Sequence, residues 1–110
     1  MEQQIKLGKL VPGMTFNQKV WTLCARVPEG KITTYGEIAK ALKCKAYRAV
    51  GNALNKNPYA PAVPCHRVVG STGALTGFAG GLAKKKALLA QEGVELTKSG
   101  RVVLREPFRF

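Results

Sequence analysis

Cys65 and His66 are the two residues of this 110-residue sequence best suited to carry out chemistry. They are adjacent, they follow a proline-rich stretch, and the chain has no other histidine. A cysteine attacks as its thiolate, and an ordinary thiol with a pKa of about 8.5 is only slightly ionised at neutral pH. His66 is the imidazole available as a base or proton relay. The pair is therefore a candidate activated nucleophile, although these residues alone fit an inert buried thiol equally well.

Two other kinds of cysteine site fit the sequence poorly. A cysteine protease needs a histidine distant in sequence from its nucleophile, whereas His66 is adjacent to Cys65. The remaining cysteines are Cys24 and Cys44, so the count is odd, and no Cys-x-x-Cys pair exists. Neighbouring residues of an extended strand point to opposite faces, which makes Cys65 and His66 a poor pair of metal ligands. We expect no disulfide framework, no metal and no cofactor.

The chain is strongly basic, with 18 Lys and Arg residues against six acidic ones and a formal charge of +12. Such a balance favours a polyanionic partner, usually nucleic acid, and a solvated basic surface is the alternative. The length suits one domain, and no apolar run approaches the ~18 residues of a membrane span. The polar N-terminus lacks a signal core. We therefore expect an intracellular protein, cytoplasmic or, in a eukaryote, nuclear, with no membrane partner.

The elements that position Cys65 begin with a lead-in, residues 1–14, in which one short strand is expected around residues 5–11. A helix should follow, because Thr15 and Gln18 have the spacing of a capping box and apolar residues then recur at helical intervals. Nearby proline and glycine residues should end this helix at about Arg26.

A pair of short helices is expected next. Thr34 and Glu37 have the spacing of a second capping box, and a further helix should run from Ala46 to about Lys56. Two short helices joined by a brief turn, the second with a basic and polar outer face, are typical of a helix-turn-helix. That outer face carries Lys45, Arg48, Asn52, Asn55 and Lys56. Many helical pairs with this pattern do not bind DNA, and the turn lacks the glycine often found there.

The segment around Cys65 is expected to be extended. Residues 57–64 contain three prolines, which cannot continue a helix, and residues 65–69 should form a buried strand. After a glycine-rich loop, residues 82–92 should be helical, with Lys84–Lys86 mostly solvated. Residues 94–104 are expected to form a terminal hairpin. The predicted fold class is therefore α+β and mainly helical.

The segment Pro64-Cys65-His66-Arg67-Val68-Val69 resembles the active-site signature of the O6-alkylguanine-DNA alkyltransferases. Further blocks agree in spacing with that family over roughly residues 14–93. They are residues 27–31 with 34–39, Arg48 to Gly51 with Asn57-Pro58, and Gly80 to Leu82 with Leu88, Leu89, Glu92 and Gly93. The resemblance implies that residues 15–110 form a winged-helix-like helix-turn-helix domain with a short active-site strand and a C-terminal hairpin.

The resemblance also implies catalytic roles. Cys65 would accept an alkyl group from guanine in DNA, His66 would deprotonate Cys65 through a water molecule, and Glu92 would orient the imidazole. Asn57 would fix the hinge before the active-site strand and contact the Glu92 network. Tyr35 would press on the phosphate 3′ to the target and help to rotate the nucleotide out of the duplex. Displacement at the alkyl carbon gives a thioether, so each molecule would act once.

DNA and base contacts are implied in the same way. Arg48 would fill the gap left by the flipped guanine and offset part of the unstacking cost. The rest of the implied DNA-binding surface is Tyr35, Lys45, Ala46, Asn52 and Lys56, and the implied guanine pocket is Pro64, Val68, Phe78 and Ala79. Backbone carbonyls of Cys65 and Val68 would accept from the guanine amino group. The implied partner is double-stranded DNA with an alkylated guanine, bound by a monomer, with cooperative binding along DNA left open.

The sequence departs from the family pattern in two places. Full-length members usually carry another N-terminal domain, whereas about fourteen residues precede the matching region here, and Ala79 stands where well-studied members have serine. Alkyltransferase-like proteins are as short, but they have tryptophan in place of the cysteine and bind alkylated DNA without transfer. Cys65 favours transfer. Lesion binding without transfer, and DNA binding with no preference for a lesion, are the alternatives.

Overall fold

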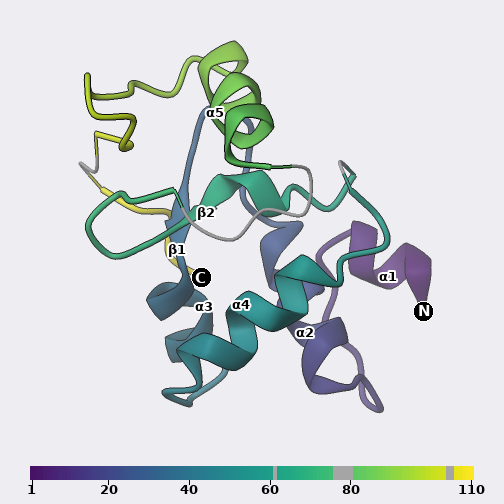
Figure 1. Ribbon diagram of the computed structural model, residues 1–110. Helices are drawn as coiled ribbons and strands as arrows, with labels where there is room; N and C mark the ends of the chain where they lie inside the picture. Colours follow the sequence, from purple (N-terminus) through teal and green to yellow (C-terminus); the bar gives the residue numbers. More distant parts are fainter. Residues whose placement is uncertain (61, 76–80, 104–105) are drawn as a thin grey trace.

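The secondary structure is mostly helical, with two short strands at its centre (Figure 1). The computed structural model describes residues 1–60, 62–75, 81–103 and 106–110. In chain order the elements are α1 (Glu2–Lys6), α2 (Phe16–Cys24), β1 (Thr33–Thr34), α3 (Tyr35–Ala41), α4 (Tyr47–Asn55), the 3-10 turn η1 (Cys65–Arg67), β2 (Val68–Val69) and α5 (Leu82–Gln91). This confirms the predicted α+β, mainly helical class. No helix in the described ranges has the length and hydropathy needed to cross a bilayer.

The N-terminal segment is helical, so the strand predicted around residues 5–11 is wrong. α1 has only five residues and depends on packing, because isolated helices of this length are unstable in water. Ile5 is fully buried in the main core. Leu7 and Leu10, whose apolar character suggested a strand, are exposed, and neither lies in a strand of the described sheet.

α2 begins where the capping box predicts. The Thr15 hydroxyl accepts from the backbone N–H of Gln18 at 3.2 Å, and the Gln18 side chain accepts from the backbone N–H of Thr15 at 2.9 Å. The helix ends at Cys24, slightly before the predicted end at Arg26. It packs against α1 and α4, and the indole N–H of Trp21 donates to a backbone carbonyl of α4 at 2.6 Å.

α3 and α4 form the predicted helical pair and pack against each other (Figure 1). Thr34 caps α3, because its hydroxyl accepts from the backbone N–H of Glu37 at 3.1 Å. The buried residues of α4 are Val50, Ala53 and Leu54, at the helical spacing that the sequence predicts. In the turn between the helices, Lys43 adopts a left-handed backbone conformation with a φ of 58°. A lysine therefore occupies the conformation that glycine normally favours.

β1 and β2 form a parallel pair that lies between two hydrophobic clusters. Thr33 pairs with Val68, and Thr34 pairs with Val69. Val68 packs in the larger cluster with α1 to α4, whereas Val69 packs in the smaller one with Leu89 of α5. Successive residues of a strand face opposite sides, so two residues are enough to join both clusters. The pair also places the start of α3 beside the segment that contains Cys65.

Residues 65–69 do not form one strand, as was predicted. Cys65–Arg67 makes a 3-10 turn, and only Val68–Val69 is extended. The backbone N–H of Cys65 donates to the carbonyl of Val63, and that of Arg67 to the carbonyl of Pro64, both at 2.9 Å. β1 is only two residues long because α3 begins at Tyr35, so it can pair with no more than two residues of the active-site segment.

The C-terminal part matches the prediction in part. α5 is followed by Gly93, whose φ of 83° is the left-handed conformation expected after a helix. Within the described residues the terminal hairpin has one antiparallel bridge, between Leu96 and Val102, and Leu104 lies outside those residues. The tail then lies beside β1, where the backbone N–H of Phe108 donates to a carbonyl at 2.7 Å.

Gly73→Ala is expected to destabilise this fold. Gly73 has a φ of 83°, and a Cβ there would run into the carbonyl oxygen of Val102. Strain and overpacking together should lower the free energy of unfolding by about 2–3 kcal/mol, measured by urea denaturation. Gly93→Ala is the matched control, since its φ is also 83° but its Cβ would meet nothing within 4 Å. Equal losses in the two variants would contradict the packing argument.

Candidate active site

Cys65 opens the 3-10 turn at the junction between the proline-rich connector and β2. Its side chain is half-buried and packs against the larger hydrophobic cluster. Asn57 fixes the connector: its amide N–H donates to the Val63 carbonyl at 2.8 Å, and its side-chain oxygen accepts from the backbone N–H of Tyr59 at 2.9 Å. These bonds fit the expected hinge, but they use both ends of the Asn57 amide within the connector rather than on Glu92 as expected.

His66 is buried, only 3% exposed, and its Nε2 lies 2.9 Å from Oε2 of Glu92. A carboxylate accepts hydrogen bonds, so Nε2 carries the proton of the neutral imidazole and Nδ1 is left as an acceptor. This is the arrangement of a base that is oriented by a carboxylate. Nδ1 of His66 is therefore the ring atom that remains available to take up a proton.

Arg67 belongs to the same network and was missed in the sequence. Its Nε and Nη2 donate to the two carboxylate oxygens of Glu92 at 2.9 and 2.6 Å, and its Nη1 donates to the Val27 carbonyl at 2.7 Å. Two parallel bonds from one guanidinium fix the plane of the carboxylate. Arg67 thereby joins the segment after α2, the 3-10 turn and the end of α5. The sequence feature that could have identified Arg67 is its position directly after Cys65 and His66.

The carboxylate of Glu92 is held in its ionised form. Burial by itself would raise the pKa of Glu92, but the hydrogen bonds from Arg67 and His66 outweigh burial and hold that pKa below its ordinary value. The hydrogen bond to Glu92 also raises the pKa of Arg67. A fixed negative charge therefore faces Nε2 of His66.

Lys85 is a buried cation, so the prediction of solvated lysines at 84–86 is wrong at its middle residue. Lys85 is 1% exposed, its Nζ donates to the Val68 carbonyl at 2.6 Å, and Nζ lies 5.9 Å from the centre of the Tyr35 ring. Position 85 shares a helix face with Leu89, one turn later and fully buried, and that spacing was the signal in the sequence. Desolvation lowers the pKa of Lys85 to about 8.

Lys85 is coupled electrostatically to Cys65. Desolvation lowers the pKa of Lys85, and a negative charge at Cys65 acts on that pKa in the opposite direction. Cys24 is different, because burial raises the pKa of its thiol far above the ordinary range and a negative Cys65 adds to that effect. Cys24 therefore stays protonated in the core and does not compete with Cys65 as a nucleophile.

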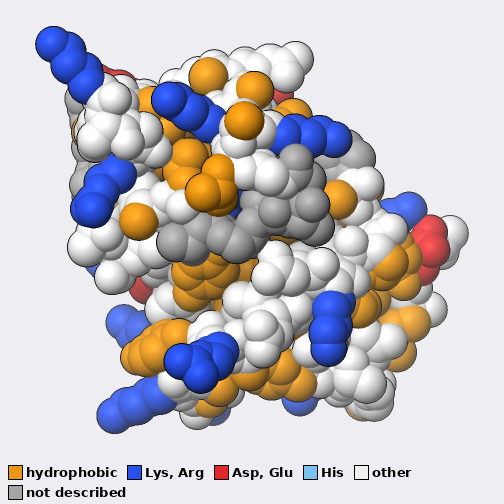
Figure 2. Space-filling view, in the orientation of Figure 1, with side chains coloured by type: hydrophobic (Ala, Val, Ile, Leu, Met, Phe, Trp, Pro, Cys, Tyr) orange, Lys and Arg blue, Asp and Glu red, His pale blue; other side chains and the backbone are white. Residues whose placement is uncertain are grey.

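The residues expected to bind DNA lie together on an exposed stretch of turn and helix. Five of the expected DNA-binding residues lie on or beside α4 and are exposed: Lys45, Ala46, Arg48, Asn52 and Lys56. Tyr35 is half-buried at the start of α3, with its ring beside Gly51 of α4. Figure 2 shows basic side chains projecting from this face of the molecule, whereas acidic side chains lie toward the edges of the view.

The expected guanine pocket is described only in part. Phe78 and Ala79 lie outside the described residues, and Pro64 and Val68 are buried. The carbonyls of Cys65 and Val68 already accept, from the Val68 N–H and from Nζ of Lys85 respectively. A carbonyl oxygen has two lone pairs, so each can still accept from a second donor.

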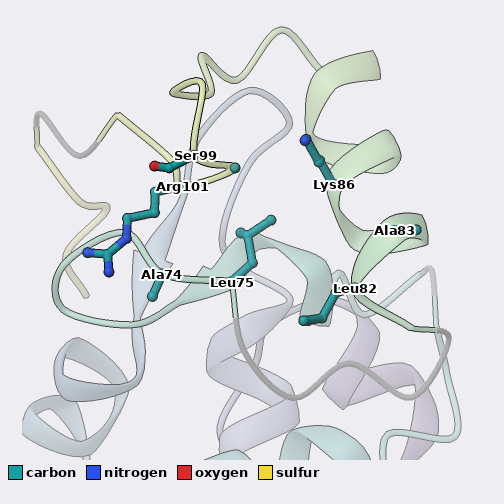
Figure 3. A pocket seen from close by; sticks show the side chains of 8 residues that line it. Ala74, Leu75, Leu82, Ala83, Lys86, Ser99 and Arg101 are labelled. Atoms are coloured by element: carbon teal, nitrogen blue, oxygen red, sulfur yellow. The ribbon is translucent and has the colours of Figure 1, made fainter.

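The open cavity in Figure 3 does not include Cys65. It has a volume of about 330 Å³ and is lined by apolar residues, among them Leu75 and Leu82, and by the cations Lys86 and Arg101. In the sequence, Leu75 and Leu82 lie on either side of Phe78. Among the described residues, no group of three potential metal ligands comes together.

Lys85→Met should slow the reaction of Cys65 with iodoacetamide at pH 7 by about tenfold or more, because the thiolate loses a buried cation. Peptide mass spectrometry separates Cys65 from the half-buried Cys44. Lys86→Met, at an exposed position next along α5, is the matched control. The same rate in both variants would show that Lys85 does not activate the thiol.

The free energy of unfolding should also depend on pH through Lys85. Its folded pKa of about 8 lies below the unfolded value of about 10.4, so the unfolded chain binds more protons between these pH values. The stability of the wild type should therefore rise from pH 8 to pH 10, relative to Lys85→Met, by on the order of 2–3 kcal/mol. Parallel pH profiles of the two proteins would contradict a buried, ionising lysine.

Known proteins share both the sequence and the fold. Residues 15–94 match the family described as 6-O-methylguanine DNA methyltransferase, DNA binding domain. The methylated-DNA–protein-cysteine methyltransferase of Methanosarcina mazei is 54% identical over 86 residues, which cover 76% of this chain and 54% of that protein. The chain thus spans about half the length of the curated relatives it matches.

Solved structures of two kinds resemble this fold. Mycobacterium tuberculosis OGT in complex with DNA has a TM-score of 0.69 and 40% identity, over 84% of this chain and 62% of that one. S. pombe Atl1 in complex with damaged DNA containing O6-carboxymethylguanine has a TM-score of 0.67 and 35% identity, over 79% of this chain and 85% of that one. On the match over residues 15–94, this chain belongs to the 6-O-methylguanine DNA methyltransferase family, through its DNA-binding domain.

Proposed function

We propose that this protein repairs DNA by moving the alkyl group of an O6-alkylguanine onto Cys65, once per molecule. The observation that carries the proposal is the hydrogen bond of 2.9 Å between His66 and Glu92 directly behind the candidate nucleophile. Such a bond gives the base its orientation and its free acceptor atom. The relatives named methylated-DNA–protein-cysteine methyltransferase support the same reading, as does the retention of cysteine at position 65.

The proposed reaction is a displacement at carbon. Sγ of Cys65 forms a bond to the alkyl carbon while the bond from that carbon to O6 of guanine breaks. The thiol proton passes through a water molecule to Nδ1 of His66, the departing guanine takes up a proton from solvent, and the imidazolium then returns its proton to solvent. Glu92 stabilises the imidazolium, and Lys85 favours the thiolate. The product is a thioether, which water does not cleave readily, so the protein remains alkylated.

Access to the base requires that the nucleotide leave the duplex, because a thiolate cannot reach O6 substituents inside the stack. We propose that residues 15–110 act as one unit on double-stranded DNA, as a monomer, with α4 in the minor groove. Arg48 would occupy the space vacated by the guanine, and Tyr35 would press on the neighbouring phosphate. Lys45, Asn52 and Lys56 would hold the backbone, which makes binding strongly salt-dependent. Such a protein acts where DNA is, in the cytoplasm or in a nucleus.

A second function is lesion recognition without transfer. The likeness to S. pombe Atl1 favours it, because that structure, with a TM-score of 0.67 and 35% identity, is a complex with damaged DNA containing O6-carboxymethylguanine. Both functions predict a preference for an alkylated duplex over an unmodified one. They differ in whether Cys65 becomes alkylated.

The test is intact-protein mass spectrometry after incubation with a duplex that contains one O6-methylguanine. Transfer predicts a gain of about 14 Da, located on Cys65 by peptide mapping and complete with excess duplex. Cys65→Ala should bind the same duplex and show no gain. If the wild type binds the lesion tightly but gains no mass, the lesion-recognition function replaces the transferase.

A further inference from the structure

The turn of the helix-turn-helix carries a second open cavity, separate from Cys65, that the proposed reaction does not use. Its volume is about 360 Å³, and its lining consists of Gly36, Lys40, Lys43, Cys44, Lys45 and Tyr47. We call this site the turn cradle. Three of its six residues are lysines and none is acidic, and in the part of the chain that the structure describes none of these lysines forms a salt bridge. The lining of the cradle is therefore positively charged.

Lys43 is kept in the cradle at a conformational cost. Its φ of 58° is the left-handed conformation, in which a side chain crowds the following carbonyl and which glycine adopts without strain. No other described residue except glycine has a positive φ. This conformation ends α3: Lys43 follows the last residues of the helix, and the backbone N–H of Cys44 donates to the Ala39 carbonyl at 3.0 Å. Glycine would meet this backbone requirement without strain, whereas the lysine found here adds an ammonium group to the lining of the cradle, with Lys40 and Lys45.

Tyr47 supplies a different kind of contact at the same place. It is the first residue of α4, directly before Arg48, and it is 53% exposed. Its ring lies close to Gly36, where a Cβ would be 3.8 Å from a ring carbon. An exposed aromatic ring with a hydroxyl suits a partner that is part apolar and part anionic.

We infer that the turn cradle binds the sugar-phosphate backbone of duplex DNA next to the lesion. The lysines would bind a phosphate, the Tyr47 ring would pack on its deoxyribose, and the Tyr47 hydroxyl would donate to a phosphate oxygen. The inference rests on the proposed function only in taking DNA as the partner. It adds Lys40, Lys43 and Tyr47 to the DNA-binding surface and gives them a role in holding the strand while Arg48 and Tyr35 act on the lesion.

Lys43→Gly gives the sharpest test, because the inference predicts opposite changes in stability and in binding. Removal of the left-handed lysine should raise Tm by a few degrees. Affinity for an unmodified 20-base-pair duplex, measured by fluorescence anisotropy, should fall about three- to tenfold. The slope of log Kd against log salt should fall by about one, as for the loss of one phosphate contact. Unchanged affinity and an unchanged slope would overturn the cradle.

Tyr47 is tested by a pair of substitutions. Tyr47→Ala should weaken duplex binding by about three- to tenfold, whereas Tyr47→Phe should retain most of the affinity because it keeps the ring. Phe16→Ala, another partly exposed aromatic position at a helix start, and Lys19→Gln, an exposed lysine of α2, are the controls that should bind as the wild type does. If both controls weaken binding as much as Tyr47→Ala and Lys43→Gly, the effect is general surface charge or hydrophobicity and the cradle is wrong.

Binding to an unmodified duplex does not require alkyl transfer, so the two proposals can fail separately. A loss of affinity in the cradle variants, with no mass gain on Cys65 in the wild type, supports the cradle and contradicts the transferase. A mass gain on Cys65, with full affinity in the variants, does the reverse. Polyglutamate is added as a competitor: if it displaces the duplex as well as unlabelled DNA does, and does so only with Lys43 present, the cradle binds an acidic protein segment instead.

Discussion

The carboxylate of Glu92 is the group on which the rest of the site depends. It accepts from His66 and, through two bonds, from Arg67, and Arg67 in turn binds the Val27 carbonyl. One half-buried anion therefore joins the end of α5, the 3-10 turn that carries Cys65, and the segment after α2. Removing a carboxylate from water costs free energy unless its oxygens are hydrogen-bonded, and three hydrogen bonds to Glu92 provide those partners. The same carboxylate fixes which nitrogen of His66 can accept a proton.

Lys85 places a buried positive charge in the same part of the molecule. Lys85 approaches along α5, donates to the Val68 carbonyl and lies over the Tyr35 ring, so it connects β2 with the first residue of α3. Its lowered pKa reflects the cost of burying an ammonium group. A negative charge at Cys65 acts in the opposite direction and raises the pKa of Lys85. The two clusters of core residues on either side of β1 and β2 hold these charges at fixed positions.

The sequence predicted much of this structure because its local signals are strong. Capping residues at Thr15 and Thr34 and apolar spacing in α4 placed those helices correctly, and the family resemblance paired His66 with Glu92. Local sequence patterns gave wrong predictions where contacts between distant segments determine the structure. Lys85 is buried because α5 turns that face toward β2, and a run of three lysines conceals it. Residues 65–69 could not form one strand because β1 offers only two partners. α1 is stabilised by the burial of Ile5, and a helix of five residues is too short for its apolar spacing to be recognised in the sequence.

The most direct test of the account is to count the lesions that each protein molecule repairs. Duplex with O6-methylguanine is supplied in several-fold excess, and the guanine restored in the DNA is measured by nucleoside chromatography against the amount of folded protein. A nucleophile that is consumed as a thioether predicts one guanine restored per molecule, reached in a single phase and not exceeded afterwards. No restored guanine, or continued turnover beyond one, would contradict the claim that Cys65 is the final acceptor.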